Sequence, residues 1–391
     1  MRIAVVVQRY GDEVLGGAER HARWVAQRLA ARHEVEVLTT CAIDHLTWEN
    51  EYDPGPTELG GLPVRRFPVA RRRSPEGLDA LSVKVHYTAH TDADERRWMD
   101  EHGPVTPGLI RHLEAETGRY DALVFFSYRH WTTYHGVRVA PRRSLLVPTA
   151  ENDPSVRLRL FRGLFRRPAA IVFNSPEERD LLAAVSGREL RGEVVGVGVE
   201  GAELPAPEEI RQRLDVIGEF VVYVGRIERD KGCSRLFADF VRYVQEQAPN
   251  LNLVLVGKAV LPIPVHVNVA HLGVLTEPEK LSVIGASRLL VNPSPHDGLS
   301  VSLLQAWKMG RPALVNGRCD VLRAQVQRAG GGLYYTSYEE FAEGMTWLRT
   351  HAEEAEAMGR AGHAYAQRNH SWDVVMAKYD RLLALAAGTS L

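Results

Sequence analysis

Two basic residues five positions apart are suited to binding a diphosphate. The stretch Gly225–Gly232 (GRIERDKG) follows a short apolar run and contains Arg226 and Lys231. Arginine offers a planar fork of donors and lysine a compact charge, and both suit phosphate oxygens. Because Glu228 and Asp230 partly cancel the charge, an ordinary solvated loop is an equally open interpretation.

A second candidate site follows another apolar run and begins with a proline-rich loop. The segment 292–307 (NPSPHDGLSVSLLQAW) predicts a helix that opens near Ser300. Asp297 and Gln305 are separated by two helical turns, so we expect Gln305 on the ligand-facing side of that helix. Backbone N–H groups at a helix start suit an anionic group. The residues that would supply them are Gly298, Leu299, Ser300 and Val301.

A pair of glycines near the N-terminus is a third candidate. Gly16 and Gly17 stand at the start of an amphipathic stretch, 18–32, after the first apolar run. Glycine lets the backbone approach a phosphate closely, and a helix N-terminus supplies N–H donors. An ordinary glycine turn is the alternative interpretation.

Two other motifs match known patterns by letter but lack the context that those sites need. Residues 196–201 (GVGVEG) satisfy G-x-G-x-x-G, yet Pro205 and Pro207 follow where a dinucleotide site would open a helix. The D-x-D at residues 92–94 has no apolar strand before it, and the acidic and basic residues after it are typical of a solvated helix start. We therefore expect no nicotinamide or flavin cofactor and no metal ion.

Short apolar runs alternate with amphipathic stretches along the chain. This alternation predicts parallel sheets covered by helices on both faces. The pattern runs twice, with strands expected at 3–7, 35–39, 122–126, 145–148 and 171–173, and then at 220–224, 253–256, 267–271, 289–291 and 313–315. The stretch 56–107 has no clear period and is interpreted as a long excursion.

The length of 391 residues favours two domains. We assign residues 1–200 to an N-terminal Rossmann-like domain and 201–370 to a second one, with Gly198–Glu208 as the linker. The amphipathic stretch 372–386 is either the last helix of the second sheet or a helix that crosses back to the first domain.

The composition is that of an ordinary globular protein, with 45% hydrophobic residues, 25% charged residues and a net charge of −1. Three scattered cysteines favour a reducing compartment over a disulfide framework. The first apolar run is too short for a signal peptide, and no run reaches the 18 apolar residues that a spanning helix needs. We expect a cytoplasmic protein, either soluble or peripheral at the inner membrane face.

Together these motifs resemble the family-four retaining glycosyltransferases of the GT-B fold. That family has a G-G-x-E turn near its N-terminus, G-R-x₄-K-G after a strand of its second domain, and P-S-x-x-E-G-x-G-L-x-x-L-E-A before a G-x-P-V turn. The segments that carry the resemblance here are 16–19, 225–232 and 293–306, with lesser matches at 173–175, 198–200, 255–257 and 271–275. The resemblance implies two Rossmann-like domains facing a cleft. It also implies that residues 371–391 cross back to the N-terminal domain.

The resemblance also implies residue roles. Gly16 and Gly17 would approach the donor diphosphate, and Arg226 and Lys231 would neutralise it as a leaving group. Asp297 would bond the donor sugar beside the N–H groups of residues 298–301. Gln305 would meet the ribose and Val274 the base. On the acceptor side, Glu151 stands nearest the place where many members have a histidine.

Two departures from the family pattern bear on activity. The family has glutamate at both ends of its E-x₇-E element, whereas this chain has Asp297 and Gln305. We expect a retaining, metal-independent transferase that moves a sugar from a nucleotide-diphosphate donor to a glycan, lipid-linked or small-molecule acceptor. The alternatives are a catalytically silent sugar-nucleotide-binding scaffold, and a sugar-nucleotide epimerase or phosphorylase on the same fold.

One basic segment suggests a further partner. Five arginines, interleaved with leucine and phenylalanine, fall between Arg157 and Arg167. They form either a solvated face of a packed helix or a peripheral contact with an anionic membrane. No pattern points to nucleic acid, and the sequence leaves the donor base, the sugar, the acceptor, the linkage and the oligomeric state open.

Overall fold

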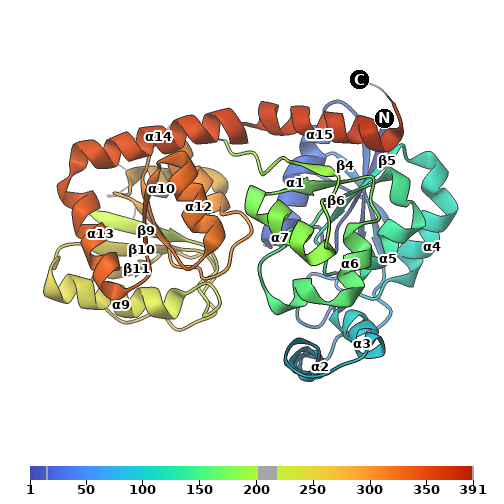
Figure 1. Ribbon diagram of the computed structural model, residues 1–391, viewed down its shortest axis with the longest axis horizontal. Helices are drawn as coiled ribbons and strands as arrows, with labels where there is room; N and C mark the ends of the chain where they lie inside the picture. Colours follow the sequence, from blue (N-terminus) through green and yellow to red (C-terminus); the bar gives the residue numbers. More distant parts are fainter. Residues whose placement is uncertain (15, 201–217, 390–391) are drawn as a thin grey trace. The chain divides into compact units, whose positions relative to one another are not determined.

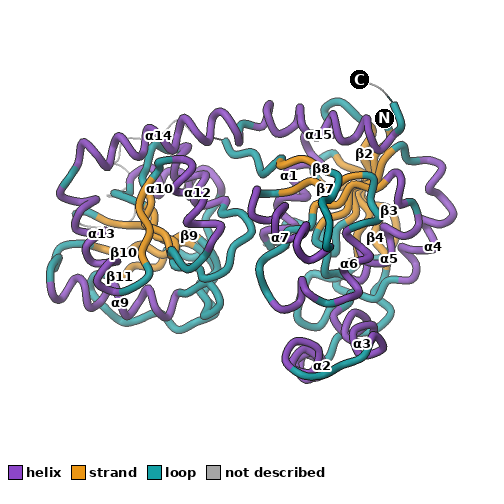
Figure 2. The backbone as a smooth tube through the Cα atoms, in the orientation of Figure 1, coloured by secondary structure: helices purple, strands orange, loops and turns teal. Residues whose placement is uncertain are grey.

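The computed structural model describes residues 1–14, 16–200 and 218–389. The chain forms two compact units, of which the first comprises residues 1–196 and 376–391 and the second residues 197–375. Each unit has a central sheet with helices around it (Figure 2). From residue 201 onward, the expected linker 198–208 lies outside the described residues.

The first unit is built on an eight-stranded sheet with the order β3-β4-β2-β1-β5-β6-β7-β8. All neighbouring strands are parallel except β3 and β4, which form an antiparallel hairpin at one edge. The central strands are apolar and buried, as strands covered on both faces require. The strands are β1 (Arg2–Val6), β2 (Glu34–Thr40), β3 (Gly55–Leu59), β4 (Leu62–Phe67), β5 (Ala122–Phe126), β6 (Ser144–Val147), β7 (Ala170–Phe173) and β8 (Gly192–Val194).

Helices cover both faces of this sheet (Figure 1). Residues of α4 to α7 share one core with Phe125 of β5. On the opposite face, His21 of α1 packs edge-on against Phe126. The helices of this unit are α1 (Gly17–Ala30), α2 (Pro75–Tyr87), α3 (Asp92–His102), α4 (Pro107–Glu116), α5 (Trp131–Val139), α6 (Arg159–Phe165) and α7 (Pro176–Ser186).

The excursion at 56–107 contains the edge hairpin β3–β4 and the helix pair α2–α3. Figure 1 shows α2 and α3 together, away from the helices that cover the sheet. In α2 only Val85 is buried, and in α3 the buried apolar residues are Trp98 and Met99. Because so few positions are buried, these elements have weak hydrophobic periodicity, which is why the sequence did not reveal them.

The second unit is built on a six-stranded sheet, all parallel, with the order β11-β10-β9-β12-β13-β14. Neighbouring residues of β9 face opposite cores: Val221 packs with α9 and α13, and Val222 packs with α10, α11 and α12. The strands are β9 (Phe220–Val224), β10 (Asn252–Val256), β11 (Val269–His271), β12 (Leu290–Asn292), β13 (Ala313–Asn316) and β14 (Gly332–Tyr335). The helices are α9 (Cys233–Glu246), α10 (Glu277–Ala286), α11 (Val301–Lys308), α12 (Asp320–Ala329), α13 (Tyr338–Thr350) and α14 (Ala352–His370).

The last helix, α15 (Trp372–Ala387), follows α14, and its residues from Met376 onward belong to the first compact unit. Tyr379 is fully buried there. Lys378 donates to the carbonyl oxygen of Val194 at 2.8 Å, and Asp380 pairs with Arg32 at 2.8 Å. Two hydrogen-bonding side chains and a buried aromatic ring therefore hold this helix on the first unit.

Candidate active site

The second sheet has a topological switch point between β9 and β12. From β9 the chain proceeds outward through β10 and β11, and it then returns to the other side of β9 to form β12. In open α/β sheets, ligands bind beyond the carboxyl ends of the strands at such a point. The two loops that begin there, 225–232 and 293–300, contain half of the twelve residues that the sequence analysis selected.

Lys231 connects these two loops. Its ammonium group donates to the carbonyl oxygen of His296 at 3.3 Å. Gly232 has a left-handed backbone with φ of 76°, and a side chain there would collide with the carbonyl oxygen of Pro293. The Arg226 guanidinium is half-exposed and pairs with Glu228 at 2.9 Å. Lys231 is thus brought next to the loop of Asp297, and Arg226 extends from the same loop as Lys231.

The start of α11 presents a row of backbone donors. Ser300 is its N-cap: the Ser300 hydroxyl accepts from the Leu303 N–H at 3.3 Å and from the Asn292 side-chain amide at 3.0 Å. Within the described part of the chain, no acceptor is assigned to the N–H groups of Gly298, Leu299, Ser300 or Val301. A helix N-terminus with unoccupied N–H groups favours an anion. The predicted helix start at Ser300 is confirmed.

Asp297 is partly buried, and its negative charge raises the pKa values of the Cys319 thiol and the Tyr223 hydroxyl. Burial raises the pKa of the Cys319 thiol to about 11, and the Asp297 carboxylate adds to the rise. Burial is also the main cause of the raised pKa of Tyr223, to which Asp297 contributes. The Tyr223 hydroxyl donates to the carbonyl oxygen of Arg226 at 2.7 Å, which fixes the start of the loop that holds Lys231.

Gln305 is buried, and its side chain already has a partner. The Gln305 amide donates to Glu277 at 3.1 Å, and the Lys280 ammonium contacts both oxygens of the same carboxylate at 2.7 Å. The Lys280 side chain is only 7% exposed, whereas that of Glu277 is 41% exposed. The position where the family has a second glutamate therefore holds an amide, and a carboxylate from α10 lies against it.

The sequence analysis missed Glu277 and Lys280. Glu277 is 28 positions from Gln305, so no local pattern connects them. The only signal was an acidic first turn, which is common at the start of helices because it complements the helix dipole.

Val274 follows β11 and is 54% exposed. The adjacent Gly273 has a left-handed backbone and accepts from the N–H of Gly257 at 2.7 Å. Gly257 itself packs so closely on the carbonyl of Gly225 that no side chain fits. The loops after β9, β10 and β11 are therefore held together by glycine contacts, with Val274 presented beside them.

The first sheet has its switch point between β1 and β5, and Gly16 follows β1 as the N-cap of α1. A side chain on Gly16 would collide with the carboxylate of Glu19, whereas Gly17 faces open space. Glu19 forms a buried ion pair with Arg9 at 2.5 Å. A side chain at the first glycine would thus have to displace the Glu19 carboxylate, and the second glycine leaves the backbone open to a ligand.

Glu151 lies in the loop after β6 and is partly buried. Its neighbour Ala150 donates its N–H to Glu178 at 2.5 Å. Burial raises the pKa of Glu178 to about 7, although backbone donors at Asn174 and Ala150 oppose the rise. Arg129, from the loop after β5, pairs with Asp153 at 2.7 Å. Glu151 therefore stands between Ala150 and Asp153, which these contacts hold in place at the carboxyl edge of the sheet.

Two family models match the chain. The model described as "Glycosyl transferases group 1" matches residues 218–351, and the "Glycosyl transferase 4-like domain" matches residues 16–198. The chain belongs to the group 1 glycosyltransferases. The two matched ranges correspond to the two sheets described above, as the GT-B fold requires. A comparison with curated proteins finds no match.

Solved structures of glycosyltransferases confirm the GT-B fold. Sucrose-phosphate synthase from Thermosynechococcus elongatus is 16% identical, with a TM-score of 0.72 over 97% of this chain and 98% of its own. HepE from Anabaena, in complex with UDP and glucose, is 16% identical, with a TM-score of 0.73 over 98% and 99%. WaaG, a glycosyltransferase of lipopolysaccharide biosynthesis, is 17% identical, with a TM-score of 0.67 over 97% and 99%.

The two motifs that match other site patterns have structural roles in this glycosyltransferase. Asp94 forms a capping box with Thr91 at the start of α3 and pairs with Lys84 at 2.7 Å, which confirms the expected helix start. Gly198 of the G-x-G-x-x-G match packs against Trp372, and residue 201 lies outside the described residues. Within residues 1–14, 16–200 and 218–389, no cluster of His, Cys, Asp and Glu is placed to hold a metal ion. No helix in the same residues has the length and apolarity to cross a membrane.

Proposed function

We propose that this glycosyltransferase binds its donor diphosphate in the second unit, between Lys231 and the start of α11. The observation that carries the proposal is the contact of Lys231 with the loop of Asp297, beside the backbone donors of residues 298–301. A diphosphate would give the Lys231 ammonium an ionised acceptor in place of the neutral carbonyl oxygen that it contacts at 3.3 Å. Arg226 would add a second cation after turning away from Glu228.

The chemistry is the transfer of a sugar to an acceptor hydroxyl with retention of anomeric configuration. The bond between the anomeric carbon and the diphosphate breaks and its electron pair leaves with the phosphate, while the acceptor oxygen bonds to that carbon from the same face. The proton of the acceptor hydroxyl passes to the departing diphosphate. Negative charge develops on the departing diphosphate, and preorganised donors stabilise it more than water does. Arg226, Lys231 and the backbone of residues 298–301 would supply this stabilisation without a bound metal. Asp297 would accept from hydroxyls of the donor sugar.

The nucleoside would lie beside α10 and the loop after β11. The exposed apolar surface of Val274 suits one face of a base. Glu277, held by Lys280 and Gln305, suits a ribose diol because a fixed carboxylate accepts two hydroxyl donors at little further cost in entropy. Glu277 therefore takes over the acidic role that the family assigns to position 305.

The first unit would supply the acceptor side. Gly17, with open space at its Cα, would approach the donor phosphate, and Gly16 would shape that turn through Glu19. Glu151 would contact the acceptor. We place the reaction in the cytoplasm, which the three buried, unpaired cysteines support.

A peripheral membrane contact through residues 157–167 is proposed in a narrower, electrostatic form. Phe161, Leu164 and Phe165 are buried in the first unit, so they are unavailable for insertion into a bilayer. Arg159 pairs with Asp92 and Glu95. The exposed charge of Arg162 and Arg167 would then provide most of any attraction to anionic headgroups.

The test of function is donor turnover by the intact protein. UDP- and GDP-sugars are incubated with and without sugar acceptors, and nucleotide release is measured for the wild type and for Asp297→Ala. We expect release by the wild type and at least a tenfold loss in the variant. Nucleotide binding without release or transfer would identify a silent sugar-nucleotide-binding protein, and an isomerised donor in the absence of acceptor would identify an epimerase.

A further inference from the structure

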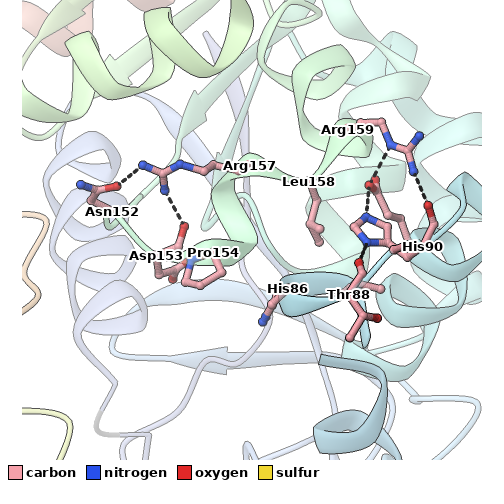
Figure 3. Close-up of a pocket in the computed structure, with 12 residues that line it drawn as sticks. His86, Thr88, His90, Asn152, Asp153, Pro154, Arg157, Leu158 and Arg159 are labelled. Carbon is pink, nitrogen blue, oxygen red and sulfur yellow. Dashed lines mark hydrogen bonds and ion pairs between the residues drawn. The ribbon is translucent and has the colours of Figure 1, made fainter. Parts of the chain in front are cut away.

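The first unit contains a cavity of about 760 Å³ that lies wholly within that unit (Figure 3). One wall is the end of α2 and the turn that leads into α3, and the other is the segment 152–159. This segment leaves the carboxyl end of β6, which is the edge where open α/β sheets bind ligands. Two residues at this edge, Ser127 and Thr149, have left-handed backbones, a strained conformation that clusters at ligand sites.

The carboxylates of the cavity are already neutralised. Glu95 has a side chain that is 2% exposed; it pairs with Arg159 at 3.2 Å and accepts from the Leu160 N–H at 2.9 Å. Asp153 pairs with Arg129 at 2.7 Å. Neither carboxylate therefore supplies an unbalanced negative charge to a ligand.

The charge of Arg157, unlike that of these two carboxylates, is not balanced by an ion pair within the described residues. As Figure 3 shows, it lies beside Asn152 and Asp153, and it donates to the side-chain oxygen of Asn152 at 2.6 Å and to the carbonyl oxygen of Asp153 at 3.1 Å. Both acceptors are neutral, and no carboxylate of the described residues pairs with Arg157. Its guanidinium is exposed and is held at the cavity by two hydrogen bonds, so its positive charge is oriented but unbalanced.

Each of the two walls also contains apolar residues. Val85, Ala89 and Leu158 line the cavity beside Pro154. Apolar residues beside polar ones suit a sugar ring, and a volume of about 760 Å³ is in the range of small-molecule sites. We propose that this cavity binds a saccharide that carries a phosphate or a carboxylate, with Arg157 on the anionic group. That this saccharide is the acceptor rests on the proposed function, whereas its binding does not.

The test is calorimetric titration of the intact protein, without donor, with glucose 6-phosphate, glucuronate and glucose. We expect at least one anionic sugar to bind roughly tenfold more tightly than glucose, because a charge-assisted hydrogen bond contributes about 1.5–3 kcal/mol. The two anionic sugars distinguish a phosphate from a carboxylate ligand.

The matched variants are Arg157→Ala and Arg162→Ala. Both remove one exposed arginine from the same segment, but only Arg157 lines the cavity. Arg157→Ala should reduce the anionic sugar to the affinity of glucose, and Arg162→Ala should leave it unchanged. Equal binding of glucose, no binding of either anionic sugar, or equal effects of the two variants would overturn the proposal and leave the donor assay unaffected.

Discussion

Replacement of Glu277 by glutamine should remove most of the enzyme's recognition of ribose. In the structure, Lys280 and Gln305 both donate to the Glu277 carboxylate, which is 41% exposed and thus open to a ligand. Glutamine keeps the size of the side chain and one carbonyl acceptor for Lys280. It removes the charge and the second acceptor that a diol would use.

The magnitude follows from the kind of hydrogen bond lost. A hydrogen bond to a charged group contributes about 1.5–3 kcal/mol, which is roughly 10- to 150-fold in Kd. We expect the Kd of the preferred nucleoside diphosphate to rise by about tenfold or more. The melting temperature should also fall, because the Lys280 ammonium is only 7% exposed and loses its counter-charge.

The decisive assay compares ribose and deoxyribose. Calorimetry with whichever of UDP and GDP binds better, and with its 2′-deoxy and 3′-deoxy counterparts, gives the preference for each hydroxyl. The wild type should prefer the ribonucleotide, and Glu277→Gln should lose that preference. The control is Glu339→Gln, which removes an exposed acid from the first turn of α13 in the same unit.

A swapped variant adds a second check. Glu277→Gln combined with Gln305→Glu keeps one amide and one acid in the pair, and it should recover part of the preference. Gln305→Glu alone places two carboxylates about 3 Å apart and should weaken binding by repulsion. If Glu277→Gln discriminates ribose from deoxyribose as the wild type does, our assignment of Glu277 is refuted.

Three further outcomes are expected. Turnover should survive excess EDTA, because side chains and backbone would neutralise the diphosphate; complete loss that magnesium restores would contradict this mechanism. Co-sedimentation with vesicles should require anionic lipid and fade with salt, and equal binding to neutral vesicles would exclude the arginine contact. Burial raises the pKa of Glu178 from 4.5 to about 7, so the native state retains a proton that the unfolded chain loses between these pH values. The free energy of unfolding should therefore fall as pH rises through that window, by about 3 kcal/mol at most. Denaturant unfolding should show this fall in the wild type and not in Glu178→Gln. If the free energy of unfolding has the same pH dependence in both proteins, the raised pKa of Glu178 is rejected.

The sequence predicted the repeated strands well because apolar runs in covered parallel sheets are nearly continuous. Ala122–Phe126 and Phe220–Val224 were predicted with their observed bounds. The helix pair α2–α3 was missed because each helix buries few residues. Parallel order itself was predictable, but the switch points were not, because strand order depends on pairing between distant segments.

The residues of the candidate site also fall into two groups, those that local motifs predicted and those that only tertiary contacts revealed. Arg226, Lys231 and Asp297 stand in short loops after strands, where motif and position coincide. Their assigned roles stay predictions. Glu277 and Lys280 entered the site only through tertiary contacts with α11, and the cavity around Arg157 is formed by an excursion without a clear pattern. A local pattern does not reveal which carboxylate lies against a buried glutamine.

The most direct test of the donor site is calorimetric titration of UDP and GDP into the wild type, Lys231→Ala and Arg229→Ala. Lys231 contacts the loop of Asp297, whereas Arg229 is an exposed residue of the same loop and matches the loss of charge. We predict one bound nucleotide in the wild type, affinity weaker by at least roughly tenfold in Lys231→Ala, and near wild-type affinity in Arg229→Ala. Wild-type affinity in Lys231→Ala, or no binding of either nucleotide to the wild type, would contradict the account.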